Sequence, residues 1–301
     1  MFISTHPYRL KLLKRVLERQ TFYSQDFTQS RRNINRAGTF LRPPRGVHGR
    51  RLDVFGVPAE LLTPANLDSP RHILYLHGGA FVSGGIASHR GLAGRIARLA
   101  DAQVLLIDYR LAPEQPYPAA IEDTHSAYNW LLEQGVTEAQ IGLAGDASGA
   151  NLALRLMQDL KRDDKPLPAC AAFLCPWLDL TCSGESMTAD NGQHPLISTG
   201  DLSKLAQMYA THHDLASPEI SPLFGDLSGL PRILVQAGAE DPLRDDAIRF
   251  AEMAREAGTS VSFEMWADMF HDWHLFAPFL EDGRWALNRV SYFLKIHSAK
   301  H

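Results

Sequence analysis

The chain has 301 residues, with 30 lysines and arginines against 34 aspartates and glutamates, and 45% of its residues are hydrophobic. This length and apolar content exclude a disordered chain and allow a buried core that needs no disulfide or metal to hold it. The formal charge of −4 argues against a nucleic-acid-binding protein, which usually presents a basic face.

The N-terminal segment predicts a helix and not a targeting signal. Basic residues interrupt every apolar run there, and no stretch of the chain approaches the roughly 18 apolar residues of a membrane span. Apolar residues recur at helical spacing, namely Leu10, Leu12, Leu13, Val16 and Leu17. The pattern is typical of a helix that packs on its own protein, which we favour, or of a basic helix on a membrane surface. We expect no membrane insertion and a cytoplasmic location.

From residue 70 onward, short apolar runs alternate with helical patterns. The runs end near Gly, Asp or Pro, as buried strands do, and cover residues 72–77, 104–110, 141–146, 171–177, 233–238 and 261–266. The helical patterns cover 88–100, 119–134, 149–162, 200–212, 243–257 and 283–296. This alternation predicts an α/β fold with a mostly parallel sheet, and two more strands are expected around 50–62 as an antiparallel edge. The looser segments 1–45 and 178–220 are expected to form a cap over it.

A glycine-containing loop follows the first of these strands. It reads His77-Gly78-Gly79-Ala80-Phe81. Two glycines allow the backbone to approach a ligand closely and to aim its N–H groups at a developing oxyanion. A simple glycine turn is the alternative, since this signal alone has only moderate specificity.

The third strand leads into a tight turn and a helix. A nucleophile elbow has small residues two positions before and two after its centre, where the turn brings strand and helix together. Gly145 and Gly149 bracket Ala147, so the centre of this elbow is alanine. An elbow centred on Ser148 is the alternative, but it would place the charged Asp146 in the crowded position.

Acidic residues follow the fifth strand, and histidines follow the sixth. Asp241 lies nearest the strand end, whereas Asp245 and Asp246 are typical first-turn acids of the next helix. His271 is preferred to His274 because it is closer to its strand. An elbow, then an acid, then a histidine is the chain order of the α/β-hydrolase triad.

Together these motifs resemble those of the hormone-sensitive-lipase-like family of α/β-hydrolase esterases, which carries an H-G-G-G motif. The resemblance covers about residues 70–295, and its motifs are HGGA (77–80), DYRLAPE (108–114), PYPAA (116–120), GDASG (145–149), DPLRD (241–245) and MFH (269–271). It implies a mostly parallel eight-stranded sheet flanked by helices. The catalytic domain would cover 46–301, with cap helices in 1–45 and a cap contribution from 178–220.

The resemblance also implies an activity and its residues. The protein would be a serine carboxylesterase for short- to medium-chain esters, with no cofactor, and its partner a small-molecule ester. Asp241 and His271 would be the triad acid and base. The oxyanion donors would be the N–H groups of Gly79, Ala80 and Ser148, with the loop shaped by Gly78. Relatives often dimerise through the last strand, so residues 261–266 or the final helix form a candidate homodimer interface.

Two departures from the family pattern bear on activity. Ala80 replaces the third glycine of the motif, which is tolerated if only its N–H is used. Ala147 stands where the family has its nucleophilic serine, and an alanine has no Oγ. Because Asp241 and His271 are retained, we favour an engineered Ser→Ala change. A natural non-catalytic small-molecule-binding protein is one alternative, and a shifted elbow with Ser148 as the nucleophile is another.

Aromatic residues beside the catalytic loops are candidates for the substrate pocket. They are Phe81, Trp177 and Phe270, each of which could equally belong to the core. No histidine set has metal-ligand spacing, so no metal is expected. The three cysteines fit neither a disulfide framework nor a metal site, and we interpret them as buried small hydrophobic residues.

Overall fold

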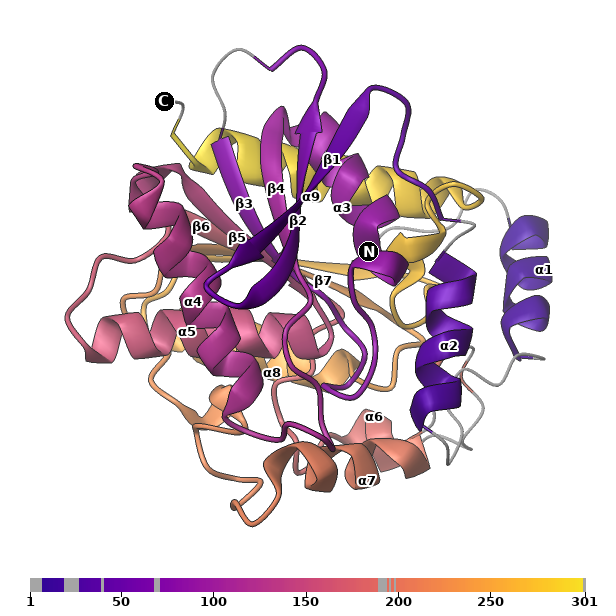
Figure 1. The fold of residues 1–301 in the computed structure, drawn as a ribbon. Coiled ribbons are helices and arrows are strands. Elements are labelled where there is room, and N and C mark those ends of the chain that lie inside the picture. Colours follow the sequence, from indigo (N-terminus) through magenta and orange to yellow (C-terminus); the bar gives the residue numbers. More distant parts are fainter. Residues whose placement is uncertain are drawn as a thin grey trace.

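Eight strands form one sheet in the computed structural model, which describes residues 7–18, 27–38, 41–67, 71–188, 194, 196–197 and 199–299 (Figure 1). The strand order is β1-β2-β4-β3-β5-β6-β7-β8. The β1–β2 and β2–β4 pairs are antiparallel, and every other pair is parallel. The strands are β1 (Val47–Val54), β2 (Val57–Pro64), β3 (Arg71–Leu76), β4 (Ala102–Ile107), β5 (Ile141–Asp146), β6 (Cys170–Leu174), β7 (Arg232–Gly238) and β8 (Val261–Trp266).

Helices cover both faces of this sheet. One face packs against α3 and α9, and the other against α4, α5 and α8 (Figure 1). The helices are α1 (Pro7–Glu18), α2 (Phe27–Gly38), α3 (Ile86–Ala100), α4 (Ala119–Glu133), α5 (Ser148–Arg162), α6 (Glu185–Thr188), α7 (Thr199–Ala210), α8 (Arg244–Glu256) and α9 (Glu281–His297). No described helix is long and apolar enough to cross a bilayer.

Burial explains why the central strands were recognisable as continuous apolar runs. Every residue of β5 and β6 is buried, as expected where helices cover both faces of a parallel sheet. The edge strand β1 exposes most of its residues and forms a hairpin with β2. The predicted α/β-hydrolase sheet, eight-stranded and mostly parallel with an antiparallel edge, is therefore confirmed, with the edge strands spanning 47–64.

The helix α2 lies within the segment 1–45, for which the resemblance implied cap helices, but its bounds were not predicted. Its residues FTQSRRNINRAG are mostly polar, with few apolar residues among them. Contacts outside the helix fix it instead: it packs on α3, and Arg31 donates to the carboxylate of Glu114 at 2.6 Å and to the carbonyl of Val82 at 2.7 Å. Such long-range polar contacts leave no periodic signal in a sequence.

Candidate active site

A strained turn joins β5 to α5. The strand ends at Asp146 and the helix begins at Ser148, so Ala147 alone makes the turn, with φ 45° and ψ −114°. A positive φ is unfavourable for a residue that has a Cβ. A Cβ added to Gly145 would lie 2.5 Å from the carbonyl carbon of Gly149, and one added to Gly149 would lie 1.9 Å from the carbonyl oxygen of Leu76. The glycines therefore allow strand and helix to approach closely enough to hold this turn.

The Gly149→Ala variant should lose about 3 kcal/mol of unfolding free energy, near the upper end for overpacking, because a backbone carbonyl cannot rotate away from the new methyl group. Gly258→Ala is the matched control, since its Cβ would meet nothing within 4 Å and only the positive φ costs about 1 kcal/mol. Urea denaturation measures both variants. Equal losses would contradict the close approach at Gly149.

The side chains of Ala147 and Ser148 lie in different surroundings. Ala147 lines a cavity at the carboxyl ends of the strands. Ser148 is fully buried, and its Oγ accepts a hydrogen bond from the N–H of Phe81 at 3.3 Å. Because α5 begins at Ser148, the N–H of this residue has no acceptor within the helix. At the turn, the backbone N–H of Ser148 is therefore available to a ligand, whereas its hydroxyl is not.

The loop after β3 presents backbone N–H groups to the same cavity. Gly79, with φ 120°, and Ala80, with φ 54°, both line the cavity. Among the hydrogen bonds of the described residues, none is donated by the N–H of Gly79 or of Ala80. The N–H of Gly78, by contrast, donates to the carboxylate of Asp146 at 2.9 Å. Gly78 therefore anchors the loop, which leaves the next two amides available to a ligand.

Asp146 is the anchor of this loop and has three partners. Besides Gly78, it accepts the Tyr75 hydroxyl at 2.6 Å and lies 3.1 Å from Nε2 of His89. Burial alone would raise the pKa of Asp146, but His89 and the Tyr75 hydrogen bond hold it below its usual range. The ionised carboxylate of Asp146 thus holds the loop at Gly78 in place. The sequence analysis did not include His89, whose partner is 57 residues away.

Asp241 and His271 form a buried pair. The Nδ1 of His271 lies 3.1 and 3.0 Å from the two carboxylate oxygens of Asp241, which also accepts the N–H of Leu243 at 2.9 Å. Burial alone would raise the pKa of Asp241, but His271 and the Leu243 amide hold it below its ordinary value. The ionised carboxylate can therefore orient the ring, with Nε2 on the side away from Asp241.

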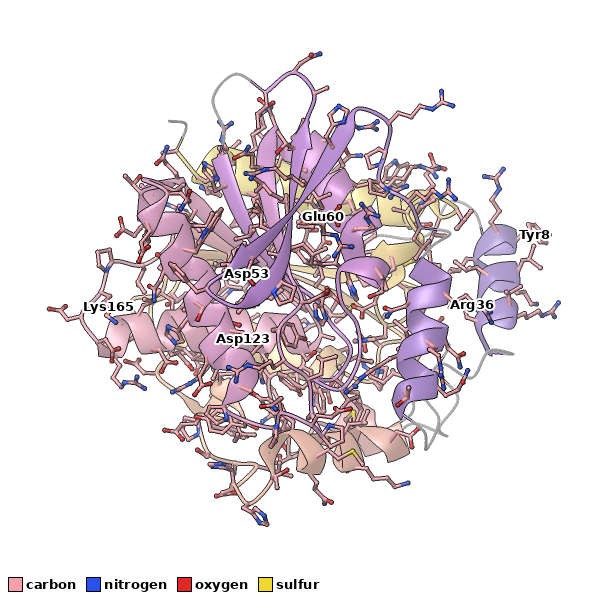
Figure 2. The ribbon with its side chains drawn as sticks, in the orientation of Figure 1. Tyr8, Arg36, Asp53, Glu60, Asp123 and Lys165 are labelled. Atoms are coloured by element: carbon pink, nitrogen blue, oxygen red, sulfur yellow. The ribbon has the colours of Figure 1, made fainter. Side chains whose placement is uncertain are left out.

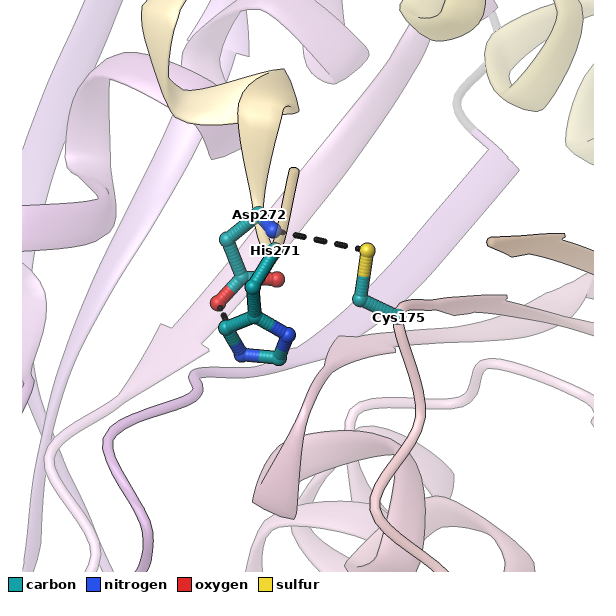
Figure 3. Close-up of side chains that lie close together, drawn as sticks. All are labelled: Cys175, His271 and Asp272. Carbon is teal, nitrogen blue, oxygen red and sulfur yellow. Dashed lines mark hydrogen bonds and ion pairs between the residues drawn. The ribbon is translucent and has the colours of Figure 1, made fainter. Parts of the chain in front are cut away.

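A second carboxylate occupies Nε2 of His271. Asp272, in the left-handed region at φ 53°, places Oδ2 3.1 Å from that nitrogen, and its N–H contacts Cys175 Sγ at 3.4 Å (Figure 3). Burial alone would lower the pKa of His271, but Asp241 and Asp272 together raise it well above its ordinary value. Burial raises the pKa of Asp272 to about 6. The position of Asp272 directly after His271 is visible in the sequence, but its contact with Nε2 depends on this left-handed backbone conformation and was not predicted.

Cys175, His271 and Asp272 bring ligand atoms within 4.8 Å of one another, which invites a test for a metal site (Figure 3). Metal binding by cysteine needs the thiolate, and burial raises the pKa of Cys175 well above its ordinary value. Both ring nitrogens of His271 are already engaged, Nδ1 by Asp241 and Nε2 by Asp272. The donor set therefore does not fit a metal ion.

The alternative acids and the second histidine are held elsewhere. Asp245 accepts the N–H of Ser186 at 2.7 Å, and Asp246 accepts the N–H groups of Leu178 and Asp179, both at 2.8 Å. His274 Nε2 lies 2.9 Å from the side-chain oxygen of Gln236. Neither these two acids nor His274 line the cavity, whereas His271 does.

The cavity has a volume of about 640 Å³ and lies between the strand ends and the N-terminal helices. Trp177 lines it, whereas Phe81 and Phe270 are not among its lining residues. The ring of Phe81 stacks on Tyr209 with centroids 3.7 Å apart, and that of Phe270 packs against Phe276 at 5.8 Å. The remaining wall is largely apolar and includes Val16, Leu17, Ile34, Leu196, Ile197 and Leu243.

Comparison with known proteins gives a consistent family. The family model described as the alpha/beta hydrolase fold matches residues 73–275. An acetyl-hydrolase of Streptomyces hygroscopicus is 44% identical over 237 residues, or 79% of each chain, and an esterase of Acinetobacter venetianus is 36% identical over 230 residues, or 76% of each chain. The crystal structure of an esterase from the bacterial hormone-sensitive lipase (HSL) family superposes with a TM-score of 0.92 at 36% identity, covering 96% of this chain and 98% of that one.

Proposed function

Because the chain belongs to the α/β-hydrolase fold family, we propose that its site is that of a serine carboxylesterase in which Ala147 occupies the nucleophile position. One observation carries the proposal. The elbow residue Ala147, the amide loop at Gly79 and Ala80, and His271 all face a single cavity. The rate of p-nitrophenyl acetate hydrolysis by an Ala147→Ser variant tests it.

With a serine at position 147, each residue has a defined task. The hydroxyl attacks the ester carbonyl while Nε2 of His271, released from its contact with Asp272, takes the proton, and Asp241 stabilises the resulting imidazolium. The oxyanion is held by the N–H groups of Gly79, Ala80 and Ser148. His271 then protonates the leaving alcohol, and water activated by the same nitrogen releases the acid.

The chain as written cannot form the acyl-enzyme, because Ala147 has no hydroxyl. The anchored loop and the buried Asp241–His271 pair support a substituted serine, since a binding protein has no need of either. A non-catalytic small-molecule-binding protein is the second candidate, and the alanine itself favours it. No gain of activity in Ala147→Ser would support that candidate.

Replacing Ser148 by alanine should leave the rate of the Ala147→Ser variant within a few-fold. The Ser148 hydroxyl is buried and accepts the Phe81 amide, while the backbone N–H that would bind the oxyanion is unchanged. Steady-state hydrolysis of p-nitrophenyl acetate measures the effect. Complete loss of activity would instead favour Ser148 as the nucleophile.

The pH–rate profile of the Ala147→Ser variant should rise at a higher pH than an ordinary histidine would give. Only the neutral imidazole accepts the serine proton, and two carboxylates raise the pKa of His271. The added change Asp272→Asn removes one of these charges, so the rising limb should move to lower pH. If the rate rises at the same pH in both variants, Asp272 does not raise the pKa of His271.

The substrate class and surroundings of the site are part of the proposal. The acetyl-hydrolase name of a relative and the apolar cavity wall support uncharged short- to medium-chain esters as substrates. We propose that 1–45 and 178–220 form the cap over domain 46–301, since residues of both line the cavity; parts of both lie outside the described residues. We still predict that the protein forms a homodimer, that it is cytoplasmic and that it does not bind nucleic acid.

A further inference from the structure

The outer face of α1 carries an apolar stripe. Tyr8 is 89% exposed, Leu12 65% and Val16 50%, and the three lie four residues apart. Side chains at this spacing lie one above the other on a helix. Figure 2 shows the Tyr8 side chain at the outer edge of the molecule. A contiguous exposed apolar surface is typical of an interaction site, above all where polar residues surround it.

Basic residues flank this stripe on both sides. Arg9, Lys11 and Arg15 are exposed. Since successive residues of an α-helix are about 100° apart, Lys11 and Arg15 lie on one side of the stripe and Arg9 on the other. No acidic side chain is present among residues 8–17 of α1. The exposed side chains among residues 8–17 are therefore apolar or positively charged.

The opposite face of α1 is fixed to the rest of the protein. Leu10 and Leu17 are buried in a cluster with Trp266 and Phe270. Lys14 adds an ion pair with Glu240 at 2.6 Å. These contacts hold the helix with its apolar stripe outward, so the stripe cannot turn inward to bury itself.

The stripe leads to the cavity of the candidate active site. Val16, its last member, lines the cavity together with Leu17. Phe279, which is 56% exposed, also lines it. An apolar path thus runs from the exposed end of α1 at Tyr8 to the place where a substrate would bind.

We propose that α1 binds the surface of an anionic lipid bilayer at the mouth of the cavity. Tyr8, Leu12 and Val16 would enter the boundary between headgroups and acyl chains, and the three basic side chains would contact the phosphates. A second copy of the chain is a poorer partner, because two such faces would bring like charges together. Delivery of an ester from the bilayer rests on the proposed function, but the binding itself does not.

Flotation of the full chain with vesicles tests the binding without any ester substrate. We expect roughly hundredfold tighter binding to phosphatidylcholine mixed with phosphatidylglycerol than to phosphatidylcholine alone, at about fivefold for each basic side chain near the surface. The triple change Arg9→Gln, Lys11→Gln and Arg15→Gln should abolish this preference. Arg50→Gln, Arg98→Gln and Arg232→Gln remove the same charge from other exposed sites and should leave it intact.

A double change Tyr8→Ser and Leu12→Gln should weaken binding at least tenfold, whereas Tyr292→Ser, at an exposed residue of α9, should not. Unchanged urea midpoints would show that these variants fold. Equal binding to both vesicle types, or equal losses in the two triple variants, would overturn the proposal. A second result would also overturn it. In that case the protein does not float with vesicles, light scattering shows a dimer, and Leu12→Gln dissociates that dimer.

Discussion

The Ala147→Ser variant should hydrolyse p-nitrophenyl acetate faster than the chain as written by a factor on the order of 10⁶, since removal of a triad nucleophile costs about that much. The gain is expected because the other parts are in place: a turn with φ 45° that exposes the residue at 147 to the cavity, an anchored amide loop, and a histidine oriented by a buried carboxylate. The assay belongs at mildly alkaline pH, where more of His271 is neutral.

A matched control separates the hydroxyl from a general effect of substitution. Ala147→Gly keeps the turn and adds no nucleophile, so it should stay at the rate of the chain as written. A rate no greater than that of Ala147→Gly would refute the assignment of position 147, and would favour a binding protein on a hydrolase fold.

In the Ala147→Ser background, His271→Ala should return the rate nearly to that of the chain as written, and Asp241→Asn should lower kcat by about 10⁴. The carboxylate at 3.0 Å from Nδ1 fixes the ring tautomer, which an amide does not. Steady-state kcat and KM measure both changes, with little effect expected on KM.

The control introduces His271→Ala and Asp241→Asn into the protein that has Ala147. Triad residues act as a unit, so once the nucleophile is absent, losing the histidine or the acid should alter the residual rate only slightly. A large loss from His271→Ala in that background would mean that His271 acts without a residue at 147, and would contradict the triad assignment.

The sequence predicted those parts of the fold that local patterns determine. The apolar runs of β5 and β6 were visible because both faces of these strands are buried. The elbow was visible because close approach permits only small residues at 145 and 149, where an added Cβ would meet backbone. The bounds and place of α2 within 1–45 were not visible, since they depend on Arg31 and other contacts far along the chain.

The site was predicted less completely than the sheet. The positions of Asp241 and His271 followed from strand ends and chain order. The contact of Asp272 with Nε2 depends on a left-handed backbone conformation after His271, which no spacing rule indicates. Phe81 stacks on Tyr209 of α7, 128 residues away along the chain, and local sequence patterns do not indicate a contact over that distance.

Covalent labelling tests most directly the central claim that position 147 is the nucleophile position of an otherwise intact esterase site. The Ala147→Ser variant and the chain as written would each be incubated with a fluorophosphonate, and the adduct located by peptide mass spectrometry. We expect one adduct in the variant, on the residue introduced at 147, and none in the protein with Ala147. An adduct on Ser148, or no adduct in a folded variant, would contradict it.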